Sequence, residues 1–527
     1  MYRKPKISFD PAQLSLTHIF DMLSLIHTTK IGRGFFYMKN IKKLTLLHSN
    51  DMHGDFLAEE IDEKLVGGVS MLSGYINKVR REERNVLYAI SGDMFRGSII
   101  DSEFKGVSTI QIMNILGPDI VTLGNHEVDY GLAHLLFLEK CAEFPIINAN
   151  MYITTNHKRL FAPCKIIEID GMKVLFIGII TEITLLECRK DNLIGTFVTL
   201  EDAAEEIGRI CNTYNSIDVD FTVLLTHIGF EEDKRLAEML DPAWGVDIII
   251  GGHSHTFLTE PAEVNGIPIV QAGIGTDQIG RFDINIDIDN NCIDSYTWKP
   301  VAINSENCPK NPAIEQVIDI YKNQTDEIYG RIITTFVREL THPTRIRETE
   351  LGDLFADIIK DALGVDIFLM ASGSIRVDRL GPIVTKGDFT TCFPYDDSAI
   401  LVHWTGAQLK HAIMRMLRDE TFEGAHTEFY QLSSGLEVEY DQTIHSFVKF
   451  NFEGEPVADD RIFSVGLQQY HFQNMKDSFD LDPEEVEKTK KSRVVASSCR
   501  TVIEEILSSG QHQDSEGEGR LIIHLAD

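Results

Sequence analysis

The feature that most constrains this chain is a set of five apolar runs in its first half, each followed by a short polar motif. The runs are continuous and rich in strand-favouring residues, which is typical of strands buried on both faces. They lie at residues 44–47, 86–90, 120–123, 223–225 and 246–250. The motifs lie at residues 51–53, 92–93, 124–127, 226–227 and 252–255, and each carries Asp, Asn or His. The pattern predicts buried strands whose ends carry metal-binding side chains.

Helical spacing appears between the first two runs, where apolar side chains recur at three- and four-residue intervals. The residues are Val69, Leu72, Tyr75, Ile76 and Val79. Alternating strands and helices predict an α/β layered domain. Ligand sites in such sheets gather at the carboxyl ends of the strands, where the loops converge. We therefore expect five motifs that are far apart in the sequence to meet at one place.

The polar side chains in these motifs are of the kinds that divalent cations accept. A carboxylate that bridges two ions holds them about 3.5–4 Å apart, the separation used for in-line displacement at phosphorus. Asp93 is the candidate bridge, because Gly92 before it allows backbone and metal to approach closely. Asp51 and His53 are two residues apart, so from an extended loop they would point the same way and chelate one ion. The candidate ligands are Asp51, His53, Asp93, Asn125, His227, His253 and His255.

The expected cofactor is a pair of divalent ions. His253 and His255 are two residues apart, so the pair can address different ions. A mixed set of oxygen and nitrogen ligands suits Mn²⁺, Zn²⁺, Fe²⁺, Co²⁺ or Mg²⁺, and the sequence does not choose among them.

The length and the net charge of the chain limit its possible domain number and binding partners. A chain of 527 residues is too long for a single core, so two large domains are expected. The formal net charge of -32 disfavours binding to nucleic-acid polymers and anionic membranes, which depends on Lys and Arg. We expect a small-molecule substrate and no membrane partner. If that substrate is anionic, local metals and arginines must offset the overall charge.

The compartment is expected to be the cytoplasm. None of the eight cysteines forms a Cys-x-x-Cys pair, and their scatter favours free thiols in a reducing environment. Residues 16–23 have helical spacing but are a poor secretory signal, since Asp21 and neighbouring histidines interrupt the apolar stretch. We predict that residues 1–40 are an N-terminal extension of uncertain role.

The rest of the chain divides into three predicted parts. Residues 41–310 form the catalytic domain, residues 311–330 form a connecting helix or hinge, and residues 331–527 form a second α/β region. The connection is predicted from a helical face with Ile314, Val317, Ile318 and Tyr321. In the second region, residues 351–362 show a helical stripe, and Thr405 with Gln408 fits a capping box.

The motifs together resemble the calcineurin-like metallophosphoesterase superfamily and, more narrowly, the 5′-nucleotidase family. The resemblance runs from about Lys42 to the C-terminus. It implies a four-layer α/β/β/α metallophosphoesterase domain followed by a second α+β nucleotide-binding domain. It also implies two ligand sets that share one carboxylate. The first set is Asp51, His53, Asp93 and His255, and the second is Asp93, Asn125, His227 and His253.

The resemblance also implies a catalytic pair, His126 and Asp129, in the run Gly-Asn-His-Glu-Val-Asp at residues 124–129. In this family a water that bridges the metals attacks phosphorus as hydroxide. His126 would stabilise charge on the phosphoryl oxygens or help to protonate the leaving oxygen. Asp129 would orient the imidazole. Glu127 matches the motif and is expected to be structural.

Substrate binding falls to the second region. Arg345 and Arg376 align with the family's phosphate-binding arginines, and Tyr395 and Tyr470 with the aromatic clamp on the base. The chain departs from the family at Ala371, where relatives carry Asn, and at residues 473–477, which replace Gly-Gly-Asp. A surface ion-pair role for the arginines and a core role for Tyr470 remain open. These departures concern recognition of the base and sugar, and they leave the phosphate chemistry intact.

The expected activity is release of phosphate from nucleoside 5′-monophosphates by a 5′-nucleotidase. Within enzymes, the alternatives are a 2′,3′-cyclic-nucleotide phosphodiesterase/3′-nucleotidase and a UDP-sugar hydrolase. A more distant relative cleaves sulfur compounds. An alternative of another class is a non-catalytic nucleotide-binding sensor. The intact metal ligands together with the intact His126–Asp129 pair argue against it, because a binding protein does not need both.

Overall fold

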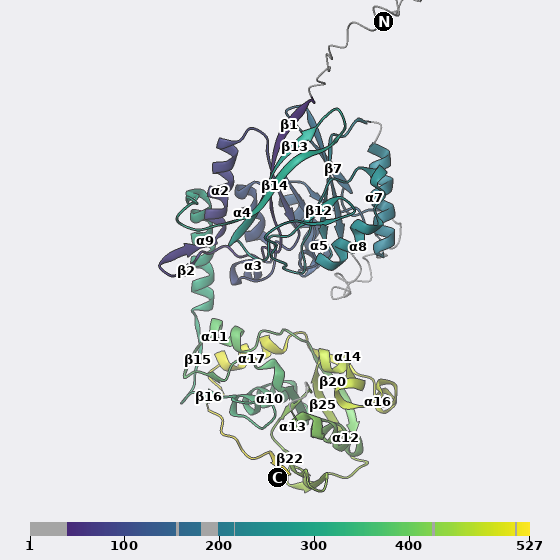
Figure 1. Cartoon of the computed structure of the whole chain (residues 1–527). Coiled ribbons are helices and arrows are strands. Elements are labelled where there is room, and N and C mark those ends of the chain that lie inside the picture. The colour runs from purple at the N-terminus through teal and green to yellow at the C-terminus, as the bar shows by residue number, and fades with distance from the viewer. Residues whose placement is uncertain are drawn as a thin grey trace, which may run out of the picture. The chain divides into compact units, whose positions relative to one another are not determined.

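The chain folds into two compact units that divide between Ile318 and Asp319 (Figure 1). The computed structural model describes residues 39–153, 158–180, 199–214, 217–423, 427–511 and 514–526. The predicted extension at residues 1–40 lies almost wholly outside these ranges. Among the described residues, no helix has both the length and the apolar character needed to cross a bilayer.

Two six-stranded sheets build the first unit. One has the order β14 (Cys292–Ala302), β13 (Gln278–Asp287), β1 (Ile41–Ser49), β4 (Val86–Ser91), β5 (Ile120–Thr122) and β6 (Ile146–Ile147). The other has the order β11 (Ala262–Val264), β12 (Ile267–Val270), β10 (Ile248–Ile250), β9 (Phe221–His227), β8 (Met172–Ile180) and β7 (Cys164–Ile169). β1, β4 and β5 pair in parallel, as do β8, β9 and β10.

The apolar runs are explained by burial on both faces of these strands. Val223 and Leu225 of β9 face the core between the two sheets, together with Leu44 of β1. Leu224 faces the opposite way, into the core under α7 (Leu200–Tyr214) and α8 (Phe230–Met239). Burying each such side chain stabilises the fold by about 1.5–3 kcal/mol. A strand buried on both faces therefore shows no polar alternation.

Helices cover the outer faces of both sheets. α2 (Val69–Glu82) and α4 (Val107–Leu116) lie on one side of the stacked sheets, and α7 and α8 lie on the other (Figure 1). The smaller elements are β2 (Glu59–Ile61), β3 (Lys64–Val66), α3 (Ile99–Glu103), η1 (His126–Val128), α5 (Leu132–Cys141) and η4 (Pro242–Trp244). The layers are α/β/β/α, which confirms the predicted fold class.

A single helix, α9 (Pro312–Tyr329), spans the predicted connection. Ile314, Ile318 and Tyr321 of the predicted apolar face are buried, and Val317 is half-buried. The division between the two units falls inside this helix.

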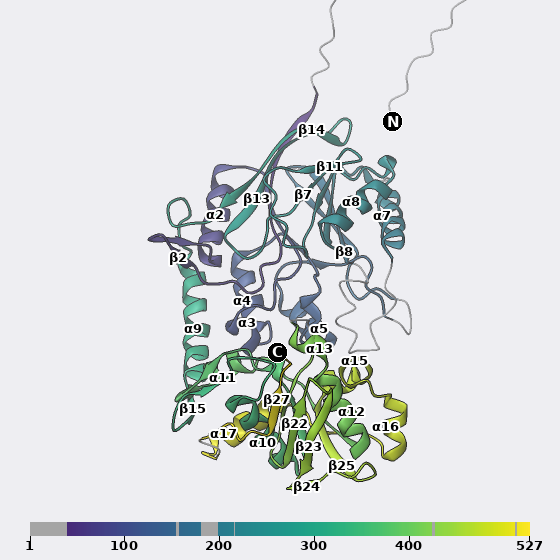
Figure 2. The ribbon, with the colours of Figure 1, turned by 60° about the horizontal axis from the view of Figure 1, so that its bottom comes forward.

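The second unit is built on the sheet β21 (Tyr430–Leu432), β17 (Ile367–Ala371), β25 (Ile462–Gln468), β20 (Ala399–Thr405) and β26 (Arg493–Ala496). Phe368 and Met370 of β17 face a core with α10 (Glu350–Leu363) and α17 (Cys499–Ser508). Ile367 and Leu369 face a second core with α12 (Gly406–Met416) and α15 (Met475–Phe479). Figure 2 shows α10 and α17 on one side of the strands and α12 on the other.

Smaller elements complete the second unit. A four-stranded sheet has the order β24 (Glu455–Pro456), β23 (Ser446–Phe452), β22 (Leu436–Asp441) and β27 (Leu521–His524). Two strand pairs are β15 (Ile332–Thr335) with β19 (Ile383–Thr385), and β16 (Leu340–Thr341) with β18 (Arg379–Leu380). The remaining helices are η5 (Ser372–Ser374), α11 (Lys386–Cys392), α13 (Asp419–Phe422), α14 (Gln469–Gln473) and α16 (Pro483–Thr489). Thr405 and Gln408 form the predicted capping box at the start of α12.

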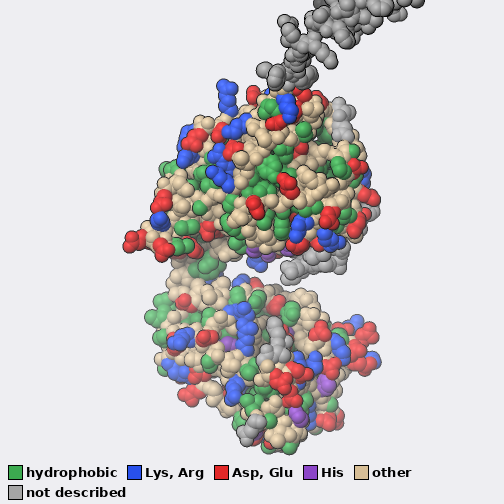
Figure 3. All heavy atoms as spheres, in the orientation of Figure 1, with side chains coloured by type: hydrophobic (Ala, Val, Ile, Leu, Met, Phe, Trp, Pro, Cys, Tyr) green, Lys and Arg blue, Asp and Glu red, His purple; other side chains and the backbone are tan. Residues whose placement is uncertain are grey.

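The surface carries acidic and basic side chains mixed over the face of each unit that is in view, and histidines reach the surface at one edge of the first unit (Figure 3).

Candidate metal centre

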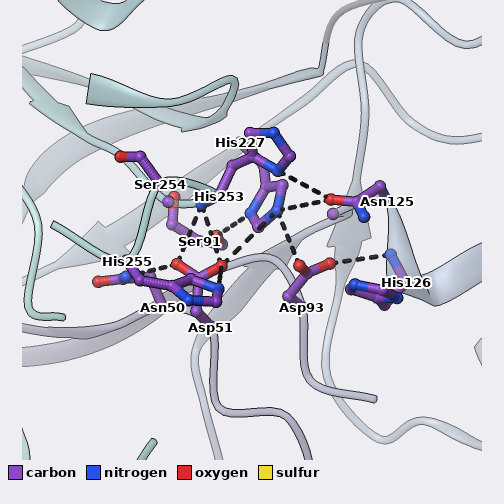
Figure 4. Close-up of polar contacts among 12 residues, drawn as sticks. Asn50, Asp51, Ser91, Asp93, Asn125, His126, His227, His253, Ser254 and His255 are labelled. Atoms are coloured by element: carbon purple, nitrogen blue, oxygen red, sulfur yellow. Dashed lines mark hydrogen bonds and ion pairs between the residues drawn. The ribbon is translucent and has the colours of Figure 1, made fainter. Parts of the chain in front are cut away.

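The five motifs meet at the carboxyl ends of five parallel strands. Asp51 and His53 follow β1, Asp93 follows β4, and Asn125 follows β5. In the second sheet, His227 is the last residue of β9, rather than a residue after it. His253 and His255 follow β10, which begins at Ile248 and not at Val246 as the sequence suggests, since 246 and 247 lie before the first paired residue. Figure 4 shows the side chains of Asp51, Asp93, Asn125, His227, His253 and His255 converging.

Ser91, the last residue of β4, joins the two sheets directly beside this point. Its hydroxyl lies 3.1 Å from the Thr226 carbonyl oxygen and 2.7 Å from that of Ile250. Because Ser91 is fully buried, these hydrogen bonds fix the ends of β9 and β10 against the end of β4. Ligands that come from different sheets are thus held in fixed positions relative to one another.

The first donor set gathers around His53. Its Nε2 lies 3.1 Å from His255 Nε2, 3.8 Å from Asp93 Oδ2 and 4.0 Å from Asp51 Oδ1. His255 Nε2 lies 3.5 Å from Asp51 Oδ1. Two imidazole nitrogens and two carboxylate oxygens therefore face a common point. They are the four residues of the first ligand set that the family resemblance implied.

The second donor set gathers around His227. Its Nε2 lies 3.1 Å from Asp93 Oδ2 and 3.2 Å from Asn125 Oδ1. Asn125 Oδ1 also lies 3.0 Å from His253 Nδ1. Asp93 Oδ2 thus faces both sets, as a bridging carboxylate would. Asp51 Oδ1 lies 3.8 Å from His227 Nε2, so it too borders the second set.

Hydrogen bonds from neighbouring groups anchor both carboxylates. Asp93 Oδ1 accepts a hydrogen bond from the His126 backbone N–H at 2.9 Å. Asp51 Oδ2 accepts from the Asn50 amide at 2.6 Å, and the His253 backbone N–H lies 3.0 Å from both Asp51 oxygens. Anchoring of this kind orients ligands before a metal binds.

The backbone at the ligands is strained. Asp51, His53, Asp93, His253 and His255 all have positive φ, between 49° and 78°. Non-glycine residues rarely adopt this left-handed conformation, and when they do they cluster at functional sites. The loop around Asp51 and His53 is therefore not extended, so the reason predicted for their proximity is wrong. Tight turns bring the two side chains together instead.

Glycines pack beneath the ligands because a side chain would displace them. A Cβ on Gly92, whose φ is +77°, would lie 2.5 Å from His227 Nδ1 and 2.7 Å from the Gly124 backbone nitrogen. A Cβ on Gly124 would lie 2.2 Å from Asp93 Oδ1. Gly92 thus allows a ligand histidine, His227, and a second glycine, Gly124, to approach the backbone closely.

We predict that Gly124→Ala lowers metal affinity by at least tenfold and destabilises the protein by about 1–3 kcal/mol, the usual cost of overpacking. The added methyl group must push Asp93 from its place. Metal titration and thermal unfolding measure the two effects. Gly517→Ala is the matched control, because its nearest neighbour would be 3.9 Å away. Equal metal affinity in both variants would contradict the role given to Gly124.

The electrostatics of the buried centre favour a cation. Burial opposes a charge on His227, yet the carboxylates of Asp93 and Asp51 raise its pKa. Burial also opposes ionisation of Asp93, but the charge on His227 lowers the pKa of that carboxyl. The carboxylates thus draw positive charge to this point. Because a histidine that binds a metal must be neutral, metal binding is expected to displace the extra proton from His227.

Histidine tautomers are set by backbone oxygens. His227 Nδ1 lies 2.9 Å from the Ser91 carbonyl oxygen, and His53 Nδ1 lies 3.2 Å from that of Phe95. In both residues Nε2 is left to face the centre, as in metal-ligating histidines generally. Three oxygen donors and four nitrogen donors are present, which suits two divalent ions of the transition-metal or magnesium kind. The residues fit the cofactor expected from the sequence.

Glu127 is structural, as expected. Its buried carboxylate accepts hydrogen bonds from the backbone N–H groups of Asp93, Met94 and Gly124. Burial and the negative charge of Asp93 raise the pKa of Glu127 to about 7. The residue fastens the Asp93 loop to the loop that carries Asn125.

His126 and Asp129 form a hydrogen-bonded pair at the edge of the centre. His126 Nδ1 lies 2.8 Å from Asp129 Oδ2, and this bond raises the pKa of His126. A His126 ring nitrogen lies within 4.8 Å of donor atoms of His53 and Asp93. The pair is thus placed to act on a group bound at the metals.

Three residues of the site carry no signal in the sequence. Asn50 bonds to Asp51, and Arg96 Nε lies 2.8 Å from Asp129 Oδ2. Asp233, which is fully buried, accepts hydrogen bonds from Thr226 and Gln271 and so fixes the residue before His227. Burial raises the pKa of Asp233 to about 7. Their roles depend on contacts formed by folding, such as the bond from Arg96 to Asp129 and the bond from Gln271 to Asp233.

In the second unit, two of the predicted substrate residues lie together. The Arg376 guanidinium carbon lies 5.9 Å from the centre of the Tyr395 ring. Arg376 is exposed and Tyr395 is half-exposed, so both can reach a ligand. A cation beside an aromatic face can hold the phosphate and the base of one small molecule.

The other two residues lie on segments that hydrogen bonds tie to this pair. Arg345 is exposed, and its loop is held by His342, whose Nε2 lies 3.2 Å from the Ser372 carbonyl oxygen. Tyr470 is 53% exposed, which excludes the core role. The backbone N–H of Gln469 before it donates to Ser398, on the loop that follows Tyr395.

The departures from the family pattern lie only partly in the core of this unit. Ala371 is buried at the end of β17, and Met475 is buried under α12. Asp477 is exposed.

The two-sheet fold with a paired set of ligands at its strand ends defines the class of metallophosphoesterases. In comparisons with known proteins, the sequence model of the calcineurin-like phosphoesterase family matches residues 44–257. The model of the 5′-nucleotidase C-terminal domain matches residues 328–481. The chain belongs to the calcineurin-like phosphoesterases that carry a 5′-nucleotidase C-terminal domain, and it is a phosphoester hydrolase.

Individual relatives agree with this placement. The chain is 29% identical to a 5′-nucleotidase of Mus musculus over 447 residues, which cover 76% of this chain and 75% of the relative. It is 28% identical to a snake venom 5′-nucleotidase of Naja atra, over 76% of this chain and 82% of the relative. A solved 5′-nucleotidase precursor from Thermus thermophilus has the same fold, with a TM-score of 0.59 and 22% identity. It matches over 92% of this chain and 100% of its own.

Proposed function

We propose that this protein is a two-metal phosphohydrolase that releases phosphate from nucleoside 5′-monophosphates. The observation that carries the proposal is Asp93 Oδ2, which faces both donor sets beside the His126–Asp129 pair. One ion would be held by Asp51, His53, Asp93 and His255, and the other by Asp93, Asn125, His227 and His253. A shared carboxylate is the usual means of holding two ions at the spacing needed for displacement at phosphorus.

The chain's own residues supply the rest of the chemistry. Divalent ions supply charge stabilisation for the phosphoryl oxygens and activate water. His126 donates a hydrogen bond from Nε2 to an oxygen of the phosphoryl group, because its Nδ1 is taken by Asp129. Asp129 holds the imidazole and stabilises its positive charge as the leaving oxygen departs.

The substrate class rests on the second unit and on the relatives. Arg376 beside Tyr395 offers a cation and an aromatic face, which suit the phosphate and the base of a nucleotide. Relatives that match across three quarters of this chain are named 5′-nucleotidases. The Arg376–Tyr395 pair supports a nucleotide substrate in general, and the names of the relatives favour 5′-nucleotides over the cyclic-phosphodiesterase/3′-nucleotidase and UDP-sugar alternatives.

A phosphate-release screen with Mn²⁺-loaded protein tests the substrate class. It covers 5′-, 3′- and 2′,3′-cyclic nucleotides, UDP-glucose and simple sugar phosphates. We expect kcat/KM for at least one 5′-monophosphate to exceed that for every other class by at least tenfold. Faster release from 3′- or cyclic nucleotides would replace the proposal with the corresponding alternative. Tight nucleotide binding with no release from any compound would favour the non-catalytic sensor.

A further inference from the structure

A cavity of about 130 Å³ lies in the first unit, at the end of its second sheet opposite the metal centre. Leu175 of β8 and Phe221, the first residue of β9, give it a buried apolar lining. Since β9 ends at the ligand His227, about 20 Å of strand separates the cavity from the metal centre. A cavity of about 150 Å³ takes a benzene-sized group. This one therefore has room for a small ligand away from the metals.

Two aromatic side chains line the cavity. Tyr214 is the last residue of α7 and Trp244 belongs to η4, and both are half-buried. Trp244 packs against α7 because residue 208 is glycine: a Cβ on Gly208 would lie 2.5 Å from the indole ring. Asp241 accepts a hydrogen bond from the Ala243 backbone N–H at 2.8 Å, which fixes the turn that carries Trp244. The ring is thus held at the cavity by the protein itself.

Asp247, which precedes β10, lines the cavity with no cation beside it. Its backbone N–H donates to the Thr222 carbonyl oxygen at 3.0 Å, and its Oδ2 accepts from the Thr222 backbone N–H at 2.8 Å. No described residue donates to the other oxygen, Oδ1. Burial raises the pKa of Asp247 to about 8. Among the described residues, no Lys, Arg or His lines the cavity, so the carboxylate has no partner of opposite charge there.

The other polar lining also accepts hydrogen bonds. Asn291, in the turn between β13 and β14, donates from Nδ2 to Asp218 Oδ1 at 3.1 Å, and both residues line the cavity. Because a carboxylate accepts, the amide nitrogen must face Asp218, and the amide oxygen is buried with no donor among the described residues. The unpaired polar atoms at the cavity are therefore acceptors, which favours a ligand that carries N–H donors.

Metal ions and anions do not match this lining. In the described part of the chain, the groups of three His, Cys, Asp or Glu donors close enough to share one ion all lie at the metal centre, and none includes Asp247. An anion would meet Asp247 and Asp218 with no basic side chain to offset them. An organic cation instead gains a charge-assisted hydrogen bond to the carboxylate and contact with the aromatic rings.

We propose that this cavity binds a small organic cation of the amidine, guanidine or amine class, between Asp247 and the rings of Trp244 and Tyr214. The N–H groups of the cation donate to Asp247 Oδ1, and its apolar part lies against the rings. The site shares no residue with the metal centre or with the predicted substrate residues, so the proposal does not depend on the proposed phosphohydrolase activity. A formal net charge of -32 also draws cations to the chain.

The test titrates the Mn²⁺-loaded full chain with benzamidine, a flat cation, and with benzamide, a neutral molecule of nearly the same shape. At pH 8.5 we expect calorimetry to give a Kd of about 0.1–1 mM for benzamidine, and binding of benzamide about tenfold weaker or more. Asp247→Asn keeps an acceptor for the Thr222 N–H. In this variant benzamidine should bind about 10- to 100-fold more weakly, and benzamide should change by less than about threefold.

The affinity for benzamidine should also rise by about tenfold or more from pH 6 to pH 8.5, because Asp247 loses its proton in this range while the amidine stays charged. The other titratable groups beside Asp247 are Cys211 of α7, Tyr214, Asp218 and Cys292 of β14. Burial raises the pKa of Cys211 to about 12 and also raises that of Cys292, so both thiols stay neutral. Asp247→Asn should therefore abolish the rise.

Asp170→Asn is the matched control, because Asp170 is exposed in the turn before β8 and lies outside the cavity lining. It should leave both affinities unchanged. Trp244→Leu is a second variant, which should weaken benzamidine by about threefold or more through loss of the aromatic face. Thermal unfolding checks that each variant is folded.

Three results would overturn the proposal: no binding of benzamidine, equal binding of benzamide and benzamidine, or undiminished binding of benzamidine to folded Asp247→Asn protein. Phosphate release bears on the proposed function alone, so the failure of one proposal leaves the other standing.

Discussion

Replacing Asp93 with asparagine should lower turnover by about 10³–10⁴-fold, the effect of losing several kcal/mol of transition-state stabilisation by the metals. Asp93 Oδ2 lies between His53 and His227 and faces both donor sets. Asparagine has nearly the same shape and can still accept the hydrogen bond from the His126 backbone N–H. What it removes is the charge that two cations share.

Three measurements check this result. Elemental analysis should show fewer than two bound ions per chain, phosphate release should fall as stated, and circular dichroism should show an unchanged fold. Asp294→Asn provides a control, because Asp294 is an exposed residue that pairs with Lys39 at the surface of the same unit. If Asp93→Asn retained two ions and full turnover, the bridging role would be wrong.

Replacing His126 with alanine should cut turnover by about 10²–10⁴-fold while both ions stay bound, the range for losing an acid–base group or a charge stabiliser. We propose that His126 contacts the phosphoryl group, and it belongs to neither donor set. Metal content and kcat are therefore expected to separate in this variant, whereas they fall together in Asp93→Asn. Asp129→Asn should lower turnover less than His126→Ala does, because the His126 imidazole is still present and Arg96 can still hold the side chain at position 129.

His445→Ala serves as the histidine control, since His445 is exposed in the second unit, between β22 and β23. Near-normal turnover in a metal-loaded His126→Ala protein would remove His126 from the mechanism. Loss of metal from that variant would instead make His126 a ligand.

The layered fold could be predicted because strands buried on both faces leave a plain signal. The runs at 44–47 and 223–225 are continuous because neighbouring residues face two different cores, and they lie inside β1 and β9. The helical spacing at 69–79 reflects the single buried face of α2. Convergence of the ligands followed from the general rule for parallel strands, and the structure brings all seven together.

Details that depend on tertiary contact could not be predicted. Spacing suggested an extended loop at Asp51 and His53, but left-handed turns hold them, because Gly97 and the backbone of Phe95 pack against that loop. Arg96 and Asp129 are 33 residues apart and share no motif, so only folding reveals their bond. The pairing of Arg376 with Tyr395 is likewise set by the packing of separate loops.

The most direct test of the central claim is phosphate release from a nucleoside 5′-monophosphate, measured as Mn²⁺ is added stepwise to metal-stripped protein. We predict no release without metal and a rate that rises until two equivalents are bound, since Asp93 joins two donor sets. Release at full rate without metal, or a rate that saturates at one equivalent, would contradict a two-metal centre.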